Sequence, residues 1–367
     1  MRRLILALAA VTAIAGPALA LDSSAGTIRV ERVAGDLEEP WGLAFLPDGG
    51  FLVTLRDGDL VHIRENGSRQ RIRGVPDVQS RGQGGLLDVA VARDFAETNE
   101  IFLTFARPQR RGEGTALAIA ELNTDAGRLR NVRVIFEMAP GSSGGRHFGS
   151  RVVEALDGTL YVTTGDRGDR PSAQDLSNHN GAVIRVTRSG QVPPDNPFVG
   201  QSGARPEIWS YGHRNPQGAT LDLNGNLWTV EHGAQGGDEI NRIRRGANYG
   251  WPVISYGRHY SGAKIGEGTA RDGMEQPALY WDPSIAPSGM MVYSGGLWPE
   301  WAGDMFVGSL KFGMISRVDG DSLREVERLE SNETERVRDI REAPDGSIWF
   351  LSVGQGAVFR MVPGSGT

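Results

Sequence analysis

Short runs of hydrophobic residues, each preceded by a turn, recur along the whole chain. The runs are rich in Val, Ile, Leu, Phe and Thr, whereas the 3.6-residue spacing of an amphipathic helix is scarce. Four segments are near-copies of one pattern, an Asp-Gly or Asn-Gly turn followed at once by such a run: residues 46–53, 156–162, 223–229 and 344–350. This pattern predicts a nearly all-β protein whose strands are joined by tight turns.

Two weaker copies, residues 94–103 and 298–307, bring the number of repeated units to six. Their equivalent strand starts lie 43 to 78 residues apart and are Phe51, Ile101, Leu160, Leu227, Met305 and Ile348. A four-stranded sheet of this length buries its faces only against neighbouring sheets, and closing the sheets into a ring leaves few free edges. We therefore predict a six-bladed β-propeller of four-stranded antiparallel sheets. A pair of β-sandwiches and a right-handed β-helix are the alternatives, although a β-helix needs much shorter repeats.

Composition narrows the chemistry that this fold could carry. The chain has 51 glycines, which suit many tight turns, and no cysteine. Zinc-thiolate sites, iron–sulfur clusters and cysteine nucleophiles are therefore excluded. With 39 basic and 45 acidic residues the net charge is −6, which argues against a general electrostatic affinity for nucleic acid.

The N-terminus has the pattern of a secretory signal peptide. Arg2 and Arg3 precede an apolar run over residues 4–15, which is too short to span a bilayer, and Ala18-Leu19-Ala20 matches a small-residue cleavage site. We predict removal of residues 1–20, leaving residues 21–367 as one propeller domain. The mature protein is then expected to be soluble, periplasmic or secreted, and without a membrane-inserted segment.

Polar groups that could carry chemistry gather in a few connecting segments. His147 and Asp166 could form the pair that a general base needs, although a loop histidine is an equally good interpretation. Glycines beside an acidic pair in residues 233–241 could offer the oxygen ligands that calcium prefers, or simply form a surface turn. Arg336 and Arg338 would point the same way from an extended segment and, with Lys311, suit a ligand with several carboxylates. A solvated charged edge is the alternative.

Seven short motifs occur in an order that is typical of one family: GQGGLL at 82–87, GRHFGSR at 145–151, GHRNPQG at 212–218, the run at 233–241, NYGWP at 248–252, SLK at 309–311 and RVRD at 336–339. On these motifs the chain resembles the glucose/sorbosone dehydrogenase family, sugar dehydrogenases that use pyrroloquinoline quinone (PQQ) on a six-bladed propeller. The resemblance extends from about residue 33 to residue 361. The chain lacks the long insertions of the glucose dehydrogenase branch, so it is more similar to the shorter PQQ-dependent soluble aldose sugar dehydrogenases.

The resemblance implies roles for individual residues. It implies that His147 is the general base and that Asp166 orients it. Cofactor ligands are implied at Gln83, Arg214, Asn215, Tyr260, Lys311, Arg336 and Arg338. The backbone carbonyls of Gly233 and Ala234 would help to bind a calcium ion on PQQ, and a structural calcium would use Glu239 and the backbone of Tyr249. Ala234 stands where the glucose dehydrogenase branch has proline, a change that a carbonyl ligand tolerates.

The function that the resemblance implies is oxidation of an aldose at its anomeric carbon to a lactone. The cofactors would be PQQ and calcium, and the electrons would pass to an external acceptor, since a chain without cysteine has no haem-attachment motif. Two other functions are compatible with a propeller. One is a non-catalytic module that binds partners, and the other is a metal-dependent sugar-lactone hydrolase, which needs carboxylate and Asn ligands that converge on the axis.

Overall fold

The computed structural model describes residues 19–364. Most of the predicted signal peptide, residues 1–18, lies outside the described residues. The last two residues of that segment, Leu19 and Ala20, belong to strand β1 (Leu19–Ser23). No helix within residues 19–364 combines the length and the apolar character needed to cross a bilayer.

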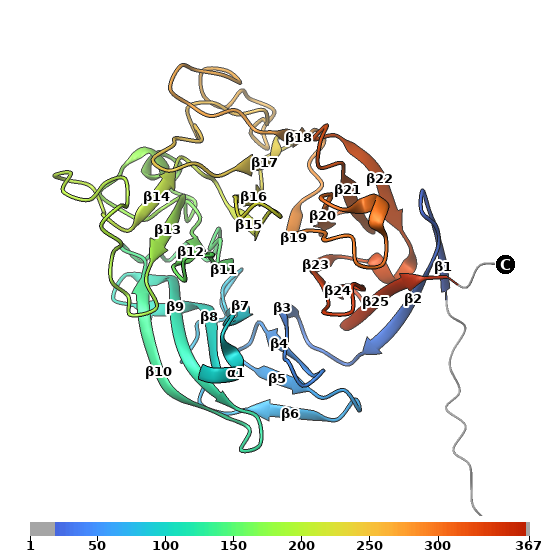
Figure 1. Ribbon diagram of the computed structural model, residues 1–367. Helices are drawn as coiled ribbons and strands as arrows, with labels where there is room; N and C mark the ends of the chain where they lie inside the picture. Colours follow the sequence, from blue (N-terminus) through green and yellow to red (C-terminus); the bar gives the residue numbers. More distant parts are fainter. Residues whose placement is uncertain (1–18, 365–367) are drawn as a thin grey trace, which may run out of the picture.

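The described chain folds into six antiparallel sheets arranged around a central axis (Figure 1). The first sheet contains β3 (Pro40–Phe45), β4 (Phe51–Leu55), β5 (Leu60–Ile63) and β6 (Arg69–Ile72). The second contains β7 (Leu86–Val91), β8 (Glu100–Gln109), β9 (Gly112–Asn123) and β10 (Arg128–Glu137). The third contains β11 (Val152–Glu154), β12 (Leu160–Thr163), β13 (Ala182–Val186) and β14 (Ile208–Tyr211). The fourth contains β15 (Pro216–Leu221), β16 (Leu227–Glu231), β17 (Asp238–Arg242) and β18 (Leu279–Trp281). The fifth contains β19 (Pro287–Val292), β20 (Met305–Ser309), β21 (Met314–Val318) and β22 (Glu325–Glu330).

The sixth sheet joins the two ends of the described chain. It contains β23 (Val337–Glu342), β24 (Ile348–Ser352) and β25 (Ala357–Pro363), followed by β2 (Gly26–Ala34) and β1. Strand β2 pairs with β25 from Ile28 opposite Pro363 to Ala34 opposite Val358. The N-terminal strands therefore close the ring, and this sheet has five strands where four were predicted.

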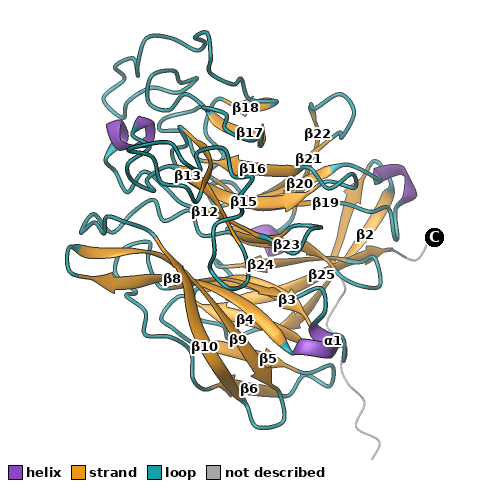
Figure 2. Cartoon of the chain, turned by 60° about the vertical axis from the view of Figure 1, so that its left-hand side comes forward, coloured by secondary structure: helices purple, strands orange, loops and turns teal. Residues whose placement is uncertain are grey.

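The predicted six-bladed propeller is confirmed, and the repeat pattern identifies the same strand in every blade. The six expected strand starts fall at or next to the first residue of β4, β8, β12, β16, β20 and β24, the second strand of each blade. Between residues 19 and 364, helix is confined to one short α-helix, α1 (Phe95–Thr98), and three 3-10 turns at Arg170–Gln174, Pro299–Trp301 and Asn332–Thr334. The long interval between the fourth and fifth units holds residues 243–278, a loop that projects from the ring between β17 and β18 (Figures 1 and 2).

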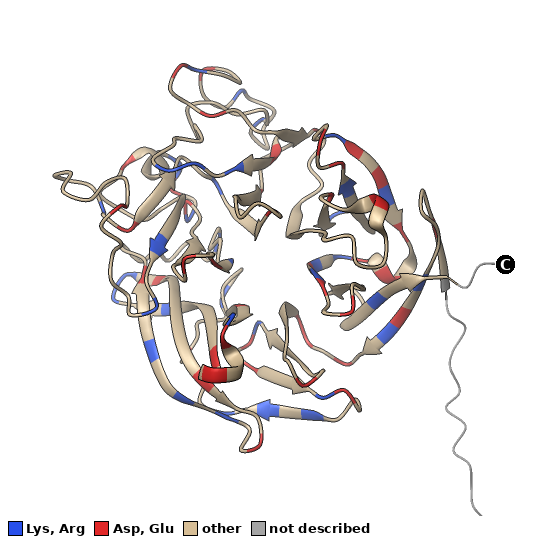
Figure 3. Cartoon of the chain, in the orientation of Figure 1, with Lys and Arg blue, Asp and Glu red and all other residues tan. Residues whose placement is uncertain are grey.

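Hydrophobic side chains lie between neighbouring blades, as the propeller requires. Leu52 and Leu60 of the first blade, for example, form one buried cluster with Val89 and Leu103 of the second. Charged side chains lie along the outer strands: the charges on β6 are arginines only, those on β10 are mainly arginines, and those on β22 are mainly glutamates (Figure 3). The blades thus bury both faces against each other and present a mixed charged surface to solvent.

A buried ion network crosses the axis. The Arg151 guanidinium lies 2.9 Å from an Asp88 carboxylate oxygen and 3.0 Å from an Asp339 oxygen, and these residues come from the third, second and sixth blades. Arg341 completes the network, at 3.1 Å from both carboxylates. The Arg151 Nε also donates to the Gln217 carbonyl of the fourth blade at 2.7 Å. One side chain therefore links four of the six blades.

We predict that Arg151→Met destabilises the fold strongly. The variant leaves Asp88 and Asp339 buried with Arg341 as their shared partner, and breaking a buried pair costs about 3–5 kcal/mol. The matched control is Arg328→Met on β22, where an exposed arginine pairs with Glu325 and its loss costs at most about 1 kcal/mol. Urea unfolding followed by circular dichroism measures both variants. Equal unfolding midpoints for the two variants would contradict the proposed link between blades.

Candidate functional site

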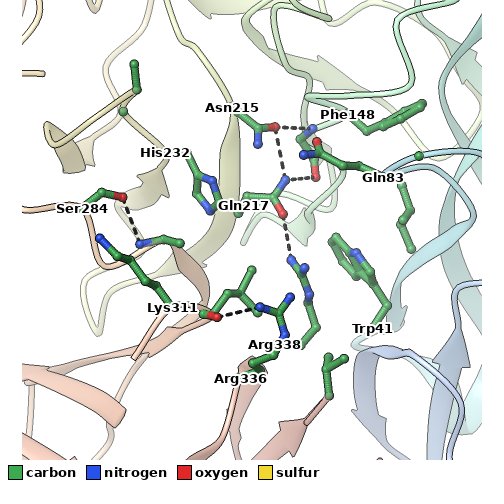
Figure 4. A pocket seen from close by; sticks show the side chains of 18 of the residues that line it. Trp41, Gln83, Phe148, Asn215, Gln217, His232, Ser284, Lys311, Arg336 and Arg338 are labelled. Carbon is green, nitrogen blue, oxygen red and sulfur yellow. Dashed lines mark hydrogen bonds between the residues drawn. The ribbon is translucent and has the colours of Figure 1, made fainter. Parts of the chain in front are cut away.

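Loops from all six blades surround a cavity of about 850 Å³ on the axis (Figure 4). Each innermost strand begins next to it, because in a propeller these strands run along the axis and bring the loops before them to one face. The residues contributed at these six strand starts are Trp41, Gln83, Phe148, Asn215, Ala286 and Arg336. A second cavity of about 390 Å³ adjoins the first, and the two share Gln83 and Tyr260 in their walls.

Three cations line one side of the larger cavity, Lys311, Arg336 and Arg338 (Figure 4). Arg336 Nη1 donates to the Leu310 carbonyl at 2.9 Å, and Arg338 Nη1 donates to Gln217 Oε1 at 2.9 Å. Among residues 19–364 none of the three forms an ion pair with a carboxylate. Burial, together with the neighbouring charges of Arg151 and Arg336, lowers the pKa of Arg338 to about 9. This side of the cavity therefore carries three positive charges that form no direct ion pair with a carboxylate of the described chain.

Arg336 and Arg338 both line the cavity, but their backbone is not the extended segment that the sequence predicted. Arg336 has φ of 51°, in the left-handed region, and β23 begins only at Val337. The segment is therefore not a continuous extended strand, and simple alternation does not explain why both side chains face the cavity. The turn at Arg336 aims that side chain, and the bond to Gln217 aims Arg338.

His147 and Asp166 form a hydrogen-bonded pair in the smaller cavity. His147 Nδ1 lies 2.6 Å from Asp166 Oδ1. Asp166 is fully buried, and it also accepts from the Gly168 N–H at 2.7 Å and from Trp251 Nε1 at 2.8 Å. Both carboxylate oxygens are thus occupied, so Asp166 is held in place and fixes the orientation of the His147 ring.

Electrostatics favour a neutral imidazole beside an ionised carboxylate. Burial lowers the pKa of His147 below its ordinary value of 6.5, against the raising effect of the Asp166 hydrogen bond, and Arg214 and Arg146 lower it further. Burial on its own would raise the pKa of Asp166, but the hydrogen bond and charge of His147 outweigh it and lower that pKa. At neutral pH the ring therefore has Nδ1–H directed at Asp166 and a free lone pair on Nε2, the form that can accept a proton.

Arg167 contacts and stabilises the loop that carries His147. This buried guanidinium donates to the Arg146 carbonyl, lies 3.5 Å from the centre of the Phe148 ring and lies 3.3 Å from Glu113 Oε1. Arg167 thereby contacts the residues on both sides of His147, which itself has φ of 54°. A Cβ on Gly165 would lie 2.1 Å from the His147 carbonyl oxygen, so glycine is required there for the loop to pack against the end of β12.

Arg214 and Asn215 lie between the two cavities. The Arg214 N–H donates to Glu231 at 2.7 Å, and the side chain extends over the Trp251 ring at 5.4 Å with its Nε unpaired. Asn215 Oδ1 accepts from the Gly149 N–H at 3.1 Å. These bonds hold Arg214 and Asn215 on the wall between the smaller cavity, which contains His147 and Asp166, and the larger cavity, which contains the three cations.

Most of the residues that the sequence assigns to the site line these cavities. The larger cavity contains Gln83, Asn215, Gly233, Ala234, Tyr260, Lys311, Arg336 and Arg338. The smaller cavity contains Gln83, His147, Asp166, Arg214 and Tyr260. Glu239 and Tyr249 line neither cavity.

Glu239 instead belongs to an acidic pair with the buried Glu231. It lies opposite Glu231 on the neighbouring strand, and burial together with the Glu231 charge raises the pKa of Glu239. Asn241 donates to both carboxylates, yet its own Oδ1 is buried without a partner. Tyr249 packs nearby, with its ring stacked on His213 at 4.5 Å. No group of three or more His, Asp or Glu side chains in the described chain has the arrangement of a metal site.

Comparison with known proteins places these features in a family. The family model described as glucose/sorbosone dehydrogenase matches residues 37–360, almost the entire described propeller. The aldose sugar dehydrogenase YliI of Escherichia coli is 43% identical over 341 residues, which cover 91% of this chain and 92% of that protein. The chain belongs to the glucose/sorbosone dehydrogenase family. The resemblance seen in the sequence motifs is thus confirmed.

One further relative and two solved structures extend the comparison. The quinoprotein glucose dehydrogenase B of Acinetobacter calcoaceticus is 27% identical, with 87% of this chain and 84% of that protein covered. The apo-form crystal structure of the soluble aldose sugar dehydrogenase from E. coli has a TM-score of 0.89 at 41% identity and covers 92% of this chain and all of that one. The PQQ-bound aldose sugar dehydrogenase of Streptomyces coelicolor has a TM-score of 0.75 at 26% identity, with 91% and 97% covered.

Several residues of this family site were not assigned a role from the sequence. Trp251 and Gln217 lie within the family motifs NYGWP and GHRNPQG, so the motifs pointed to them without saying what they contact. Trp41 and Arg167 carried no such signal. Their part in the site depends on side chains that are distant in the chain, since Trp41 packs under Arg151 at 4.2 Å and Arg167 meets Glu113.

We predict that Arg167→Met lowers the dehydrogenase kcat on the order of tenfold to a hundredfold. Methionine fills the space but cannot bond the Arg146 carbonyl or Glu113, and a misplacement of about 1 Å at a reacting group has an effect of this size. Arg167→Lys keeps a charge and a donor and should recover part of the loss. Steady-state kinetics with the cofactor supplied measures both variants. A methionine variant as fast as the parent would show that Arg167 does not position His147.

Proposed function

We propose that this protein oxidises aldose sugars at the anomeric carbon to lactones with PQQ as its cofactor. The observation that carries the proposal is the juxtaposition of two groups on the axis: uncompensated cations in one cavity and a hydrogen-bonded His147–Asp166 pair in the next. The named activities of the most similar relatives support it. A lactone hydrolase would have no use for the three cations, Lys311, Arg336 and Arg338, that line this cavity.

PQQ is a quinone that carries three carboxylates, and the chemistry of the larger cavity suits it. Lys311, Arg336 and Arg338 would bind the carboxylates through charge-assisted hydrogen bonds. Arg214, whose Nε has no partner, and Asn215 would face the quinone carbonyls, and Gln83 and Tyr260 would contact the ring. When bound, the quinone supplies an acceptor for the hydride that leaves the anomeric carbon.

His147 would act as the general base. Its Nε2 would accept the proton of the anomeric hydroxyl while Asp166 holds the Nδ1–H and stabilises the imidazolium that forms. Because the pKa of His147 is lowered, the ring is already neutral at pH 7 and ready to accept this proton.

Calcium is part of the proposal. The Gly233 and Ala234 carbonyls would serve an ion next to the cofactor, since both residues line the larger cavity. For a second ion, the opposed Glu231 and Glu239 carboxylates and the unpartnered Asn241 Oδ1 supply the oxygen donors that calcium prefers. A cation there would hold Glu239 ionised, against the effect of burial. The backbone of Tyr249 would complete this site.

The remaining parts of the proposal concern electrons and location. The electrons would leave to an external acceptor. The signal peptide over residues 1–20 would direct the protein to the periplasm or outside the cell, where the sugar and acceptor would be met.

We predict that removing the cavity cations weakens PQQ binding. Each charge-assisted contact contributes roughly 1.5–3 kcal/mol, so each of Lys311→Ala, Arg336→Ala and Arg338→Ala should raise the Kd about tenfold to a hundredfold. Fluorescence titration of the apo-protein with PQQ in the presence of calcium measures this. Arg69→Ala on the outer strand β6 removes the same charge far from the axis and is the control. Unchanged titration curves in a triple variant would refute the assignment.

Sugar oxidation with a dye acceptor should need both PQQ and calcium and should stop when a chelator is added.

We predict that His147→Ala separates binding from catalysis. The variant should keep PQQ affinity but lose about 10²- to 10⁴-fold in kcat, the usual contribution of a positioned base. In the parent protein, activity should rise with pH as His147 loses its proton. Because burial lowers the pKa of His147, this rising limb of the pH–activity profile should lie below about pH 6.5. The limb should vanish in the variant. Parent-like turnover with PQQ bound would show that His147 is not the base.

A further inference from the structure

The smaller cavity carries more positive charge than the reaction of a neutral sugar requires. Its walls contain three guanidinium groups, Arg146, Arg170 and Arg214, and one carboxylate, Asp166. Both oxygens of Asp166 are occupied by His147, Gly168 and Trp251. Among residues 19–364, no carboxylate pairs with any of the three guanidiniums.

The carboxylates of the proposed cofactor would not pair with Arg146 or Arg170. Lys311, Arg336 and Arg338 already match its three carboxylates from the other cavity, and Arg214 would face the quinone. Arg146 and Arg170 line only the cavity that holds His147. Two guanidiniums therefore remain beside the space for the sugar.

Arg170 is held in position without being neutralised. Its Nη1 lies 2.7 Å from His259 Nδ1, and arginine can only donate, so this histidine nitrogen is the acceptor. The guanidinium also lies 5.7 Å from the centre of the Trp251 ring, whose Nε1 bonds Asp166. A half-buried arginine fixed by a histidine and an indole keeps its full charge and most of its donors for a ligand.

Arg146 is the second of these guanidiniums in the wall of the smaller cavity. Its carbonyl is held by Arg167, and its side chain lies over Gly168, where a Cβ would come within 2.6 Å of Arg146 Nε. Glycine at 168 thus leaves room for the arginine to lie along the cavity wall. The side chain is exposed, so its charge is accessible to a ligand that enters from solvent.

We infer that the preferred substrate is an aldose that carries an anionic group away from its anomeric carbon, such as a hexuronate or a sugar phosphate. Arg170 and Arg146 would bind the carboxylate or phosphate by charge-assisted, bidentate hydrogen bonds. The anomeric hydroxyl would lie at His147. This inference rests on the proposed function and adds the substrate class to it.

Steady-state kinetics of the PQQ-loaded protein tests the inference with four sugars. At low salt, kcat/KM for glucuronate or for glucose 6-phosphate should exceed that for glucose and xylose at least about tenfold, and salt should reduce the advantage. The glucuronate and phosphate arms tell which anion fits. The ratio of anionic to neutral kcat/KM should fall about tenfold in Arg170→Gln and in Arg146→Gln, and it should not change in the control Arg69→Gln.

A binding measurement that needs no turnover accompanies the kinetics. The pair 1,5-anhydroglucitol and 1,5-anhydroglucitol 6-phosphate lacks the anomeric hydroxyl and differs only in the phosphate. Calorimetry should show tighter binding of the phosphate to the PQQ-loaded parent and loss of that difference in Arg170→Gln. If glucuronate proves to be the preferred anion, the 6-carboxylate analogue of 1,5-anhydroglucitol should show the same pattern.

The outcomes separate this inference from the proposed function. Oxidation of neutral aldoses as efficient as that of both anionic sugars would overturn the inference while leaving the proposed function intact. An equal loss for neutral and anionic sugars in the arginine variants would also overturn it, because the arginines would then serve His147 alone. No oxidation of any aldose by the PQQ-loaded protein would refute the proposed function itself.

Discussion

Closure of the ring by the pairing of β2 with β25 is the constraint on which the rest of the structure depends. Each blade buries its two faces only when it has two neighbours, so an open ring would expose the hydrophobic faces of the first and sixth blades. Closure also sets the site, because it brings the start of every innermost strand to the axis. Gln83 and Arg338 are distant in the chain, yet they line one cavity because the first strands of the second and sixth blades share that axis.

Two kinds of buried charge lie near the axis, one paired with opposite charges and one unpaired. In the network of Arg151, Asp88, Asp339 and Arg341, every buried charge has an opposite partner, and the network joins blades. Beside it, Arg338 shares the axis with Arg151 but bonds the neutral Gln217 side chain and forms no direct ion pair with a carboxylate of the described chain. The chain has more acidic than basic residues, so its composition does not explain why Arg338 lacks a carboxylate partner. Burying an unpaired charge is costly, and a structure that retains one at a cavity is consistent with a ligand that supplies the missing anion.

Much of the fold and part of the site could be predicted from local sequence. The turn-and-strand repeat marked the second strand of all six blades, because a tight turn and a buried strand are set by neighbouring residues. His147 and Asp166 were predicted as a possible pair from their residue types, the family resemblance added their roles, and the structure places their side chains 2.6 Å apart. The support from Arg167 and the link through Arg151 could not be predicted. Both depend on contacts between blades, which no local pattern encodes.

The sequence by itself determined the class of fold, the number of blades and the residue types available for chemistry, since turn propensity and strand hydrophobicity act over a few residues. Tertiary structure alone decided which of those residues meet. It made β2 part of the last blade, aimed Arg336 through a left-handed backbone, and put Glu239 outside both cavities and opposite Glu231. It also left Arg170 beside His147 with its charge uncompensated. Ring closure is the physical reason, because it converts segments far apart in the chain into neighbours around one axis.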